Sequence, residues 1–191
     1  LVVCADYVLS KTPGNTVSNM SSSRALRDVT NTHKGSYEAS AVGEVNVVEL
    51  MKKNNAIIGG EGNGGIIYPE LHYGRDSLVG VALFLTHLAN KKMTVSALRA
   101  SYPEYYMSKN KIELTPQIDV DAILVAMTEK YKNEDITTID GVKIDFASEW
   151  VHLRKSNTEP IIRIYTEAPS QKEADVLALR IIDEIKAIAG I

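Results

Sequence analysis

The sequence predicts two small domains in tandem, an α/β layer domain followed by a small α+β domain in which two helices cover an antiparallel sheet. Strand-like and helix-like segments alternate up to about residue 95, which is typical of a sheet covered by helices. Four strand-like segments then follow one another closely up to residue 167. The 191 residues are enough for two such domains. We place the boundary between residues 98 and 99, which gives domains 1–98 and 99–191.

The first domain should begin within a helix, because Val2, Val3, Tyr7 and Val8 fall at helical spacing. A chain that starts inside an element is expected to be a fragment of a longer protein. The later elements are expected in this order: strand 16–20, helix 24–29, strand 36–42, a helix from 47 to 54, strands 56–58 and 66–68, and helix 78–88, capped at its start by Asp76 or Ser77. Helix 78–88 is apolar nearly all round, so we expect it to be buried on more than one side.

The second domain should follow a connecting stretch from Leu98 to Tyr106. Val142, Ile144 and Phe146 alternate with charged residues, which predicts a strand with one buried face. The elements are expected in this order: a helix over 120–127, strands near 136, over 142–146, 150–154 and 161–167, and a final helix with an apolar stripe from 174 to 188.

The composition excludes several classes of function. A net charge of -3 and a pI near 5.8 disfavour nucleic-acid binding, which requires a basic surface. No apolar stretch reaches the ~20 residues of a membrane span. Cys4 is the one cysteine, so no internal disulfide can form, and we expect a cytoplasmic protein with Cys4 buried.

A cluster of glycines, residues 59–65, separates two strand-like segments of the first domain. Gly60, Gly62 and Gly65 satisfy the G-x-G-x-x-G spacing of dinucleotide-binding loops, but that motif needs a helix directly after the glycines. Here a strand that ends at Pro69 follows, and the Gly-Lys-Ser/Thr of a P-loop is absent. A tight turn and a ligand-binding loop are the two interpretations that remain.

Two polar residues between the glycines favour the ligand-binding loop. A tight turn accounts for the glycines but not for Glu61 and Asn63. A carboxylate and an amide can accept from, and donate to, adjacent hydroxyls of a sugar. We therefore predict that Glu61 and Asn63 bind a sugar, with the plain turn as the alternative.

A second polar stretch, from Arg154 to Pro160, lies between two strands of the second domain. The planar fork of the Arg154 guanidinium suits a phosphate. Ser156, Asn157 and Thr158 add neutral donors, and successive backbone N–H groups in such a loop can hold an anion. The residues alone leave two interpretations open, a phosphate loop and a solvated polar turn.

Other chemistry finds little support in the sequence. The four histidines show no metal spacing, and a single cysteine cannot build a zinc site. No nucleophile elbow is present. We predict no metal site and no catalytic residue within this chain.

Together the two loops resemble those of the α-D-phosphohexomutases, the family of phosphoglucomutase, phosphomannomutase and phosphoglucosamine mutase. The third domain of that family carries a sugar loop G-E-x-S-G-H, and the fourth carries a phosphate loop R-x-S-[GN]-T-E-P. Residues 60–64 match the first motif in part, and residues 154–160 match the second throughout. Gly43-Glu44 and residues 74–76 resemble the segments that flank the sugar loop. The resemblance spans the whole chain and equates its domains with the third and fourth of the family.

The chain departs from the family pattern at two positions. Asn63 stands where serine is common, and it can still bind a hydroxyl. Gly65 stands where histidine is frequent, so any acid–base role of that histidine is absent here. The E-x-N-G-G form is similar to that of the glucosamine and archaeal-like branches, which favours a glucosamine or mixed hexose substrate.

The resemblance implies an intramolecular phosphotransferase of the isomerase class. Such an enzyme interconverts hexose 1-phosphate and hexose 6-phosphate through a phosphoserine, with Mg²⁺ and a hexose 1,6-bisphosphate intermediate. The phosphoserine loop and the metal loop belong to N-terminal domains that this sequence lacks. We therefore expect a phosphosugar as partner, no mutase activity in this chain alone, and Mg²⁺ bound outside it. The alternative is a non-catalytic phosphosugar-binding module.

Overall fold

The computed structural model describes residues 1–113, 118–156 and 161–190. The chain divides into two compact units, Leu1–Glu104 (unit 1) and Tyr105–Ile191 (unit 2). The sequence analysis placed this boundary between residues 98 and 99, within helix α5 (Val95–Ala100). Within the described ranges, no helix is both long and apolar enough to cross a membrane.

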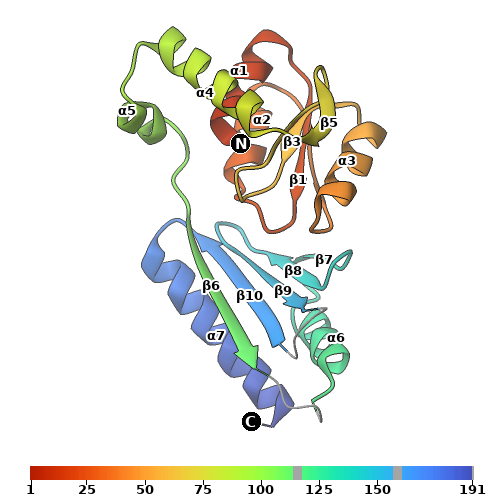
Figure 1. Ribbon diagram of the computed structural model, residues 1–191. Coiled ribbons are helices and arrows are strands. Elements are labelled where there is room, and N and C mark those ends of the chain that lie inside the picture. Colours follow the sequence, from red (N-terminus) through yellow and green to blue (C-terminus); the bar gives the residue numbers. More distant parts are fainter. Residues whose placement is uncertain (114–117, 157–160, 191) are drawn as a thin grey trace. The chain divides into compact units, whose positions relative to one another are not determined.

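Unit 1 is a mixed sheet with helices on both faces, in the strand order β2-β1-β3-β4-β5 (Figure 1). The first three strands pair in parallel, β4 pairs antiparallel with β3, and β5 pairs antiparallel with β4. Its strands are β1 (Asn15–Asn19), β2 (Tyr37–Ser40), β3 (Ala56–Gly60), β4 (Ile66–Tyr68) and β5 (His72–Arg75). Its helices are α1 (Val2–Lys11), α2 (Ala25–Thr32), α3 (Glu44–Lys53), α4 (Ser77–Lys91) and α5.

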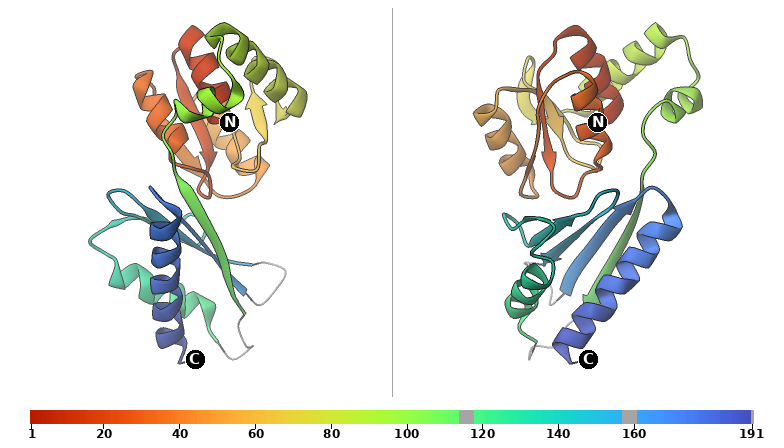
Figure 2. Two further views of the ribbon diagram at one scale, coloured as in Figure 1. Left: turned by 90° about the vertical axis from the view of Figure 1, so that its left-hand side faces the viewer. Right: turned by 180° about the vertical axis from the view of Figure 1, so that it is seen from behind.

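The two faces of this sheet bury separate cores. Ile58 and Ile66 pack with α1 and α2, whereas Val17 and Ile67 pack with α3. Side chains alternate between faces along a strand, so neighbouring residues enter opposite cores. Figures 1 and 2 show α3 on the opposite side of the sheet from α1. The predicted α/β layer fold is therefore confirmed, although β5 was not predicted.

Helix α4 differs from the expectation of burial on more than one side. Leu78, Val81 and Leu85 are 79%, 53% and 54% exposed. The helix contacts the core mainly through Leu83 and Phe84. Asp76 caps it as predicted, because its side chain accepts from the backbone N–H groups of residues 78 and 79.

Unit 2 is an antiparallel sheet with two helices, in the strand order β6-β10-β9-β8-β7. Its strands are β6 (Tyr106–Glu113), β7 (Asp135–Thr137), β8 (Val142–Asp145), β9 (Trp150–Lys155) and β10 (Ile161–Ala168). Its helices are α6 (Val120–Lys130) and α7 (Gln171–Ala189). Strand β6 was not predicted, and Tyr106 at its start had been assigned to the connecting stretch. It pairs with β10 along its whole length.

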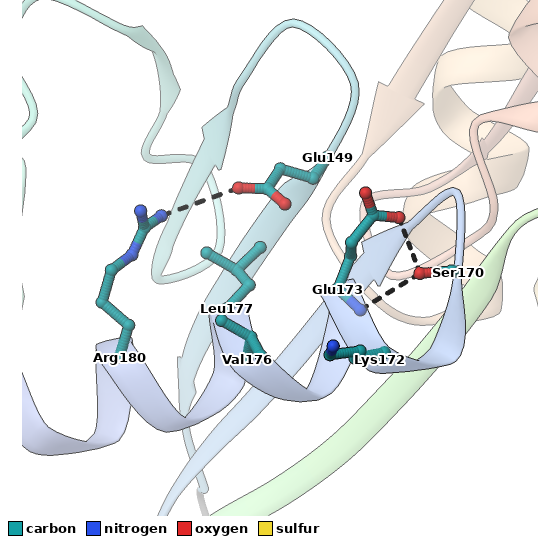
Figure 3. Close-up of a pocket in the computed structure, with 7 residues that line it drawn as sticks. All are labelled: Glu149, Ser170, Lys172, Glu173, Val176, Leu177 and Arg180. Atoms are coloured by element: carbon teal, nitrogen blue, oxygen red, sulfur yellow. Dashed lines mark hydrogen bonds and ion pairs between the residues drawn. The ribbon is translucent and has the colours of Figure 1, made fainter.

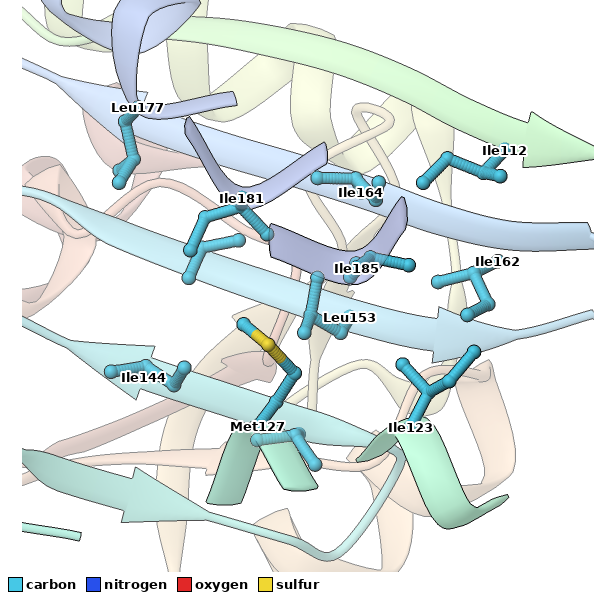
Figure 4. Close-up of a cluster of buried hydrophobic side chains, with 12 residues drawn as sticks. Ile112, Ile123, Met127, Ile144, Leu153, Ile162, Ile164, Leu177, Ile181 and Ile185 are labelled. Atoms are coloured by element: carbon cyan, nitrogen blue, oxygen red, sulfur yellow. The ribbon is translucent and has the colours of Figure 1, made fainter. Parts of the chain in front are cut away.

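One core holds unit 2 together, on the face of the sheet that the helices cover (Figure 4). Ile123 and Met127 of α6 meet Ile181 and Ile185 of α7 over Leu153 of β9. All five side chains are at most 2% exposed. Residues of β9 and β10 that point away from this core, Arg154 and Arg163 among them, form the other face of the sheet.

Candidate functional site

The glycine cluster forms a tight connection between the antiparallel strands β3 and β4. The backbone N–H of Glu61 donates to the carbonyl of Gly65 at 3.0 Å, and that of Gly64 donates to the carbonyl of Glu61 at 3.2 Å. Gly64 has φ +93°, which favours glycine. A Cβ at Gly60 would lie 1.9 Å from the carbonyl oxygen of Gly65, so no larger residue fits there. A strand, not a helix, follows these glycines, which agrees with the rejection of a dinucleotide loop.

Glu61 lies at the base of this loop and is 5% exposed. Its Oε1 accepts from Asn19 Nδ2 at 2.9 Å, and its Oε2 accepts from Arg75 Nη1 at 3.1 Å. Asn19, at the end of β1, is itself fixed by the Ser22 hydroxyl, which donates to its Oδ1 at 2.8 Å. The carboxylate of Glu61 is therefore held in one position by groups from two other strands.

Arg75 joins Glu61 to a second carboxylate. Its Nε donates to Glu44 Oε2 at 2.8 Å, and its backbone N–H donates to Glu44 Oε1 at 2.9 Å. These hydrogen bonds, the backbone one first, lower the pKa of Glu44 below its ordinary value. Glu44 begins α3 and Arg75 ends β5, so residues far apart in sequence meet beside the glycine loop.

Asn63 lies at the exposed tip of the loop. Its Oδ1 accepts from the backbone N–H of Gly65 at 3.1 Å, which fixes the side chain over the turn. His72, which is near the loop in sequence, instead lies 3.1 Å from Asp76 through its Nε2. Asn63, Glu61 and Arg75 therefore lie close together, whereas His72 contacts Asp76, the residue that caps α4.

The phosphate loop begins at Arg154, near the end of β9. Arg154 Nε donates to the Asp140 carboxylate, at 3.1 Å from Oδ1 and 3.0 Å from Oδ2. The backbone N–H of Ser156 donates to the carbonyl of Ile161 at 3.0 Å, which closes the connection between β9 and β10. Two further predicted residues, Asn157 and Thr158, lie outside the described residues.

Arg163 was missed by the sequence analysis. It pairs directly opposite Arg154 in the antiparallel register, and Lys111 of β6 is opposite Arg163. Three cationic residues therefore form a row across neighbouring strands, on the face away from Leu153, Ile162 and Ile164 of the core. The register of β9 and β10 brings Arg163 opposite Arg154, and a sequence pattern does not give that register.

A pocket of about 370 Å³ lies beside the start of α7. Figure 3 shows the residues that line it. Its lining residues are Glu149, Ser170, Lys172, Glu173, Val176, Leu177 and Arg180. Arg180 lies 3.7 Å from Glu149, and Ser170 and Glu173 cap each other. The Glu173 carboxylate occupies the end of α7 where an anion would bind, so this pocket suits a phosphate poorly.

Each histidine has an acidic or carbonyl neighbour. His33 and His87 lie 2.7 Å and 3.0 Å from the carboxylate of Asp6, and His152 Nε2 lies 2.7 Å from the carbonyl oxygen of Asp140. Burial lowers the pKa of His152. In the part of the chain that the structure describes, no three His, Cys, Asp or Glu side chains gather in a way that could hold a metal ion.

Each of the two units matches a known protein domain family. Residues 1–106 match the profile "Phosphoglucomutase/phosphomannomutase, alpha/beta/alpha domain III". The chain belongs to this family. Residues 110–184 match "Phosphoglucomutase/phosphomannomutase, C-terminal domain". The predicted resemblance to the third and fourth domains of the phosphohexomutases is thus confirmed.

Similar proteins include phosphoglucosamine mutases. A phosphoglucosamine/phosphogalactosamine mutase of Sulfurisphaera tokodaii is 36% identical over 174 residues, which are 90% of this chain and 37% of the relative. The chain therefore spans about two fifths of the length of the curated relative that it matches. A phosphoglucomutase/phosphomannomutase family protein from Burkholderia thailandensis shares the fold, with a TM-score of 0.79 at 21% identity over 98% of this chain and 41% of its own.

The fold also recurs in the N-acetylphosphoglucosamine mutase of Aspergillus fumigatus. That structure contains GlcNAc-6P and magnesium, and it matches with a TM-score of 0.67 at 15% identity, over 98% of this chain and 43% of its own. A variant of the Aspergillus enzyme was solved with glucose 1,6-bisphosphate. At this identity the likeness shows the fold alone.

Proposed function

We propose that this chain supplies sugar and phosphate recognition to a phosphohexomutase that interconverts hexose 1-phosphate and hexose 6-phosphate. The proposal rests on two side chains, one from each loop, that hydrogen bonds within their own unit hold in place. Glu61 is fixed by Asn19 and Arg75, and Arg154 is fixed by Asp140. Groups held in place before the ligand arrives lose little freedom when they bind it.

The sugar loop is assigned to the hydroxyls of the hexose. Asn63 is exposed at its tip, and each carboxylate oxygen of Glu61 can accept a further hydrogen bond besides the one from Asn19 or Arg75. The similarity to a phosphoglucosamine/phosphogalactosamine mutase supports an amino-sugar phosphate as the substrate, with glucose and mannose phosphates as the alternatives.

The phosphate loop is assigned to the phosphate that is not transferred. Arg154 can offer its terminal nitrogens to the ligand, because its contact with Asp140 uses Nε. Ser156, Asn157 and Thr158 are assigned to the same phosphate from their place in the loop sequence, and the last two lie outside the described residues. Anchoring one phosphate in this way makes the reaction at the other end of the sugar effectively intramolecular.

The phosphoryl chemistry is assigned to domains outside this chain. Among the described residues, no three His, Cys, Asp or Glu side chains are arranged to hold a metal ion. The chain spans about two fifths of its relative, which leaves room for domains that carry a phosphoserine and Mg²⁺. We expect this chain alone to show no turnover of glucose 1-phosphate or glucosamine 1-phosphate in a coupled assay. Measurable turnover would contradict that assignment.

Binding of glucosamine 6-phosphate and inorganic phosphate, followed by NMR titration, tests the function. We expect dissociation constants of about 1 mM for the sugar phosphate, since only part of the substrate is enclosed. Arg154→Gln should weaken both ligands about tenfold, the effect of one charge-assisted hydrogen bond. Lys155→Gln is the matched control, because the Lys155 ammonium pairs with Asp121 at 3.0 Å. Equal effects of the two substitutions would overturn the phosphate-loop assignment.

A further inference from the structure

The stem of Arg75 crosses the glycine loop where a side chain at position 65 would stand. A Cβ added to Gly65 would lie 2.6 Å from Arg75 Cδ and 3.1 Å from its Cγ. The φ of Gly65 is outside the left-handed range, so its backbone does not demand glycine. Glycine is needed at position 65 for space, and Arg75 uses that space.

The guanidinium of Arg75 is fixed along one edge. Nε donates to Glu44 and Nη1 donates to Glu61, and these are its contacts among the described residues. A guanidinium carries five donors in one plane, so Nη2 keeps two N–H groups beyond these contacts. The Arg75 side chain is 44% exposed, whereas that of Glu61 is 7% exposed. Arg75 is therefore the accessible member of the pair, and Glu61 orients it from below.

The charge of this cluster selects the kind of group that it can bind. Two carboxylates surround one guanidinium, which leaves one negative charge in excess. A phosphate dianion is disfavoured beside such a cluster. A neutral hydroxyl can accept from the guanidinium and donate to a carboxylate at the same time.

We propose that Arg75 is a further substrate-recognising residue of the sugar loop, and that its guanidinium donates to a hydroxyl oxygen of the hexose. This inference rests on the proposed function, and it adds the partly exposed Arg75 to the predicted pair Glu61 and Asn63. Gly65 is needed for this role of Arg75, because a side chain at position 65 would displace Arg75.

A double-mutant cycle tests this proposal. Binding of glucosamine 6-phosphate to the chain is measured by NMR titration for the wild type, Arg75→Gln, Gly65→Ala and the double variant. We expect each single substitution to weaken the sugar phosphate about tenfold, the effect of one charge-assisted hydrogen bond. The double variant should bind as weakly as Arg75→Gln alone, because alanine at 65 acts only by moving Arg75. The affinity for inorganic phosphate should stay within about twofold of the wild type in every variant, because none of these substitutions changes Arg154, the residue proposed to bind phosphate.

Arg99→Gln is the matched control in the same unit, because it also removes one exposed arginine side chain. Arg99 lies in α5, outside the sugar loop, so binding should stay within about twofold. The amide spectrum of unit 1 shows whether each variant is folded. Gly65→Ala keeps the proposal testable if Arg75→Gln unfolds the unit, because it retains every charge.

Three results would overturn the proposal. Wild-type affinity in folded Arg75→Gln would exclude a contact with the sugar while leaving the proposed function standing. Additive losses in the double variant would show that Gly65 acts independently of Arg75. Absence of sugar-phosphate binding by the wild type would instead remove the proposed function, and the role of Arg75 with it.

Discussion

Arg75 in unit 1 and Arg154 in unit 2 are both oriented by acidic side chains, and they differ in the charge that surrounds them. Arg75 lies between Glu44 and Glu61. Arg154 contacts one carboxylate, that of Asp140, and has Arg163 opposite it on the next strand. The first cluster has an excess of negative charge and the second an excess of positive charge. This difference in charge supports the proposed assignment of a sugar hydroxyl to Arg75 and of a phosphate to Arg154.

The largest expected effect comes from removing the buried carboxylate of unit 1. Glu61→Ala removes the acceptor of Asn19 Nδ2 and of Arg75 Nη1, and Asn19 is 5% exposed. We expect unit 1 to lose about 2 kcal/mol of unfolding free energy, less than for a fully buried pair because Arg75 is partly solvated.

The single tryptophan makes this measurement specific to one unit. Trp150 is fully buried in unit 2, so its fluorescence follows unfolding of unit 2, while far-UV circular dichroism follows both units. Urea titration of Glu61→Ala should shift the circular-dichroism transition and leave the Trp150 transition in place. An unchanged circular-dichroism transition would show that Glu61 is not a structural anchor.

A smaller effect of opposite sign is expected in unit 2. Arg154 and Arg163 face each other across β9 and β10, and like charges directly opposite destabilise a sheet. Arg163→Thr should therefore raise the unfolding free energy by about 0.5 kcal/mol, with a gain that shrinks at high salt. Urea titration followed by Trp150 fluorescence measures it. A loss of stability that is insensitive to salt would contradict the charge balance described for unit 2.

The smallest effect concerns pH. The pKa of Glu44 is lowered by hydrogen bonds from Arg75, so Glu44 stabilises the folded unit fully above its ordinary pKa of 4.5. That contribution should be lost as the pH falls through the lowered folded-state pKa. The difference in urea midpoint between wild type and Glu44→Gln should therefore shrink between about pH 6 and about pH 3. A constant difference over this range would argue against the Arg75–Glu44 pair.

The sequence predicted the order of most elements because their hydrophobic periods are local. Strand β4 and the cap at Asp76 were predicted directly, and the two loops were recognised from their polar residues. Strand β6 was missed, since its pairing with β10 depends on residues about 50 positions away. The burial of α4 on more than one side was also predicted wrongly, because an apolar helix sequence does not show which elements pack against it.

The candidate site shows the same division. Glu61 and Arg154 could be named from motifs, but Asn19 and Asp140 reach them only through the packing of the sheet. Arg75 falls within residues 74–76, which the sequence set beside the sugar loop by resemblance alone, and its contact with Glu44 needed the fold. Its position over Gly65 follows from the antiparallel pairing of β4 and β5, which fixes Arg75 opposite Ile67.

The most direct test of the account compares two ligands on the same wild-type chain. Amide chemical shifts are followed during titration with inorganic phosphate and, separately, with glucosamine 6-phosphate. We predict that inorganic phosphate shifts the residues around Arg154 and Ser156 alone, and that the sugar phosphate also shifts residues 60–65 and Arg75. Shifts in residues 60–65 with inorganic phosphate, or none there with the sugar phosphate, would contradict the assignment of the two loops to different parts of the substrate.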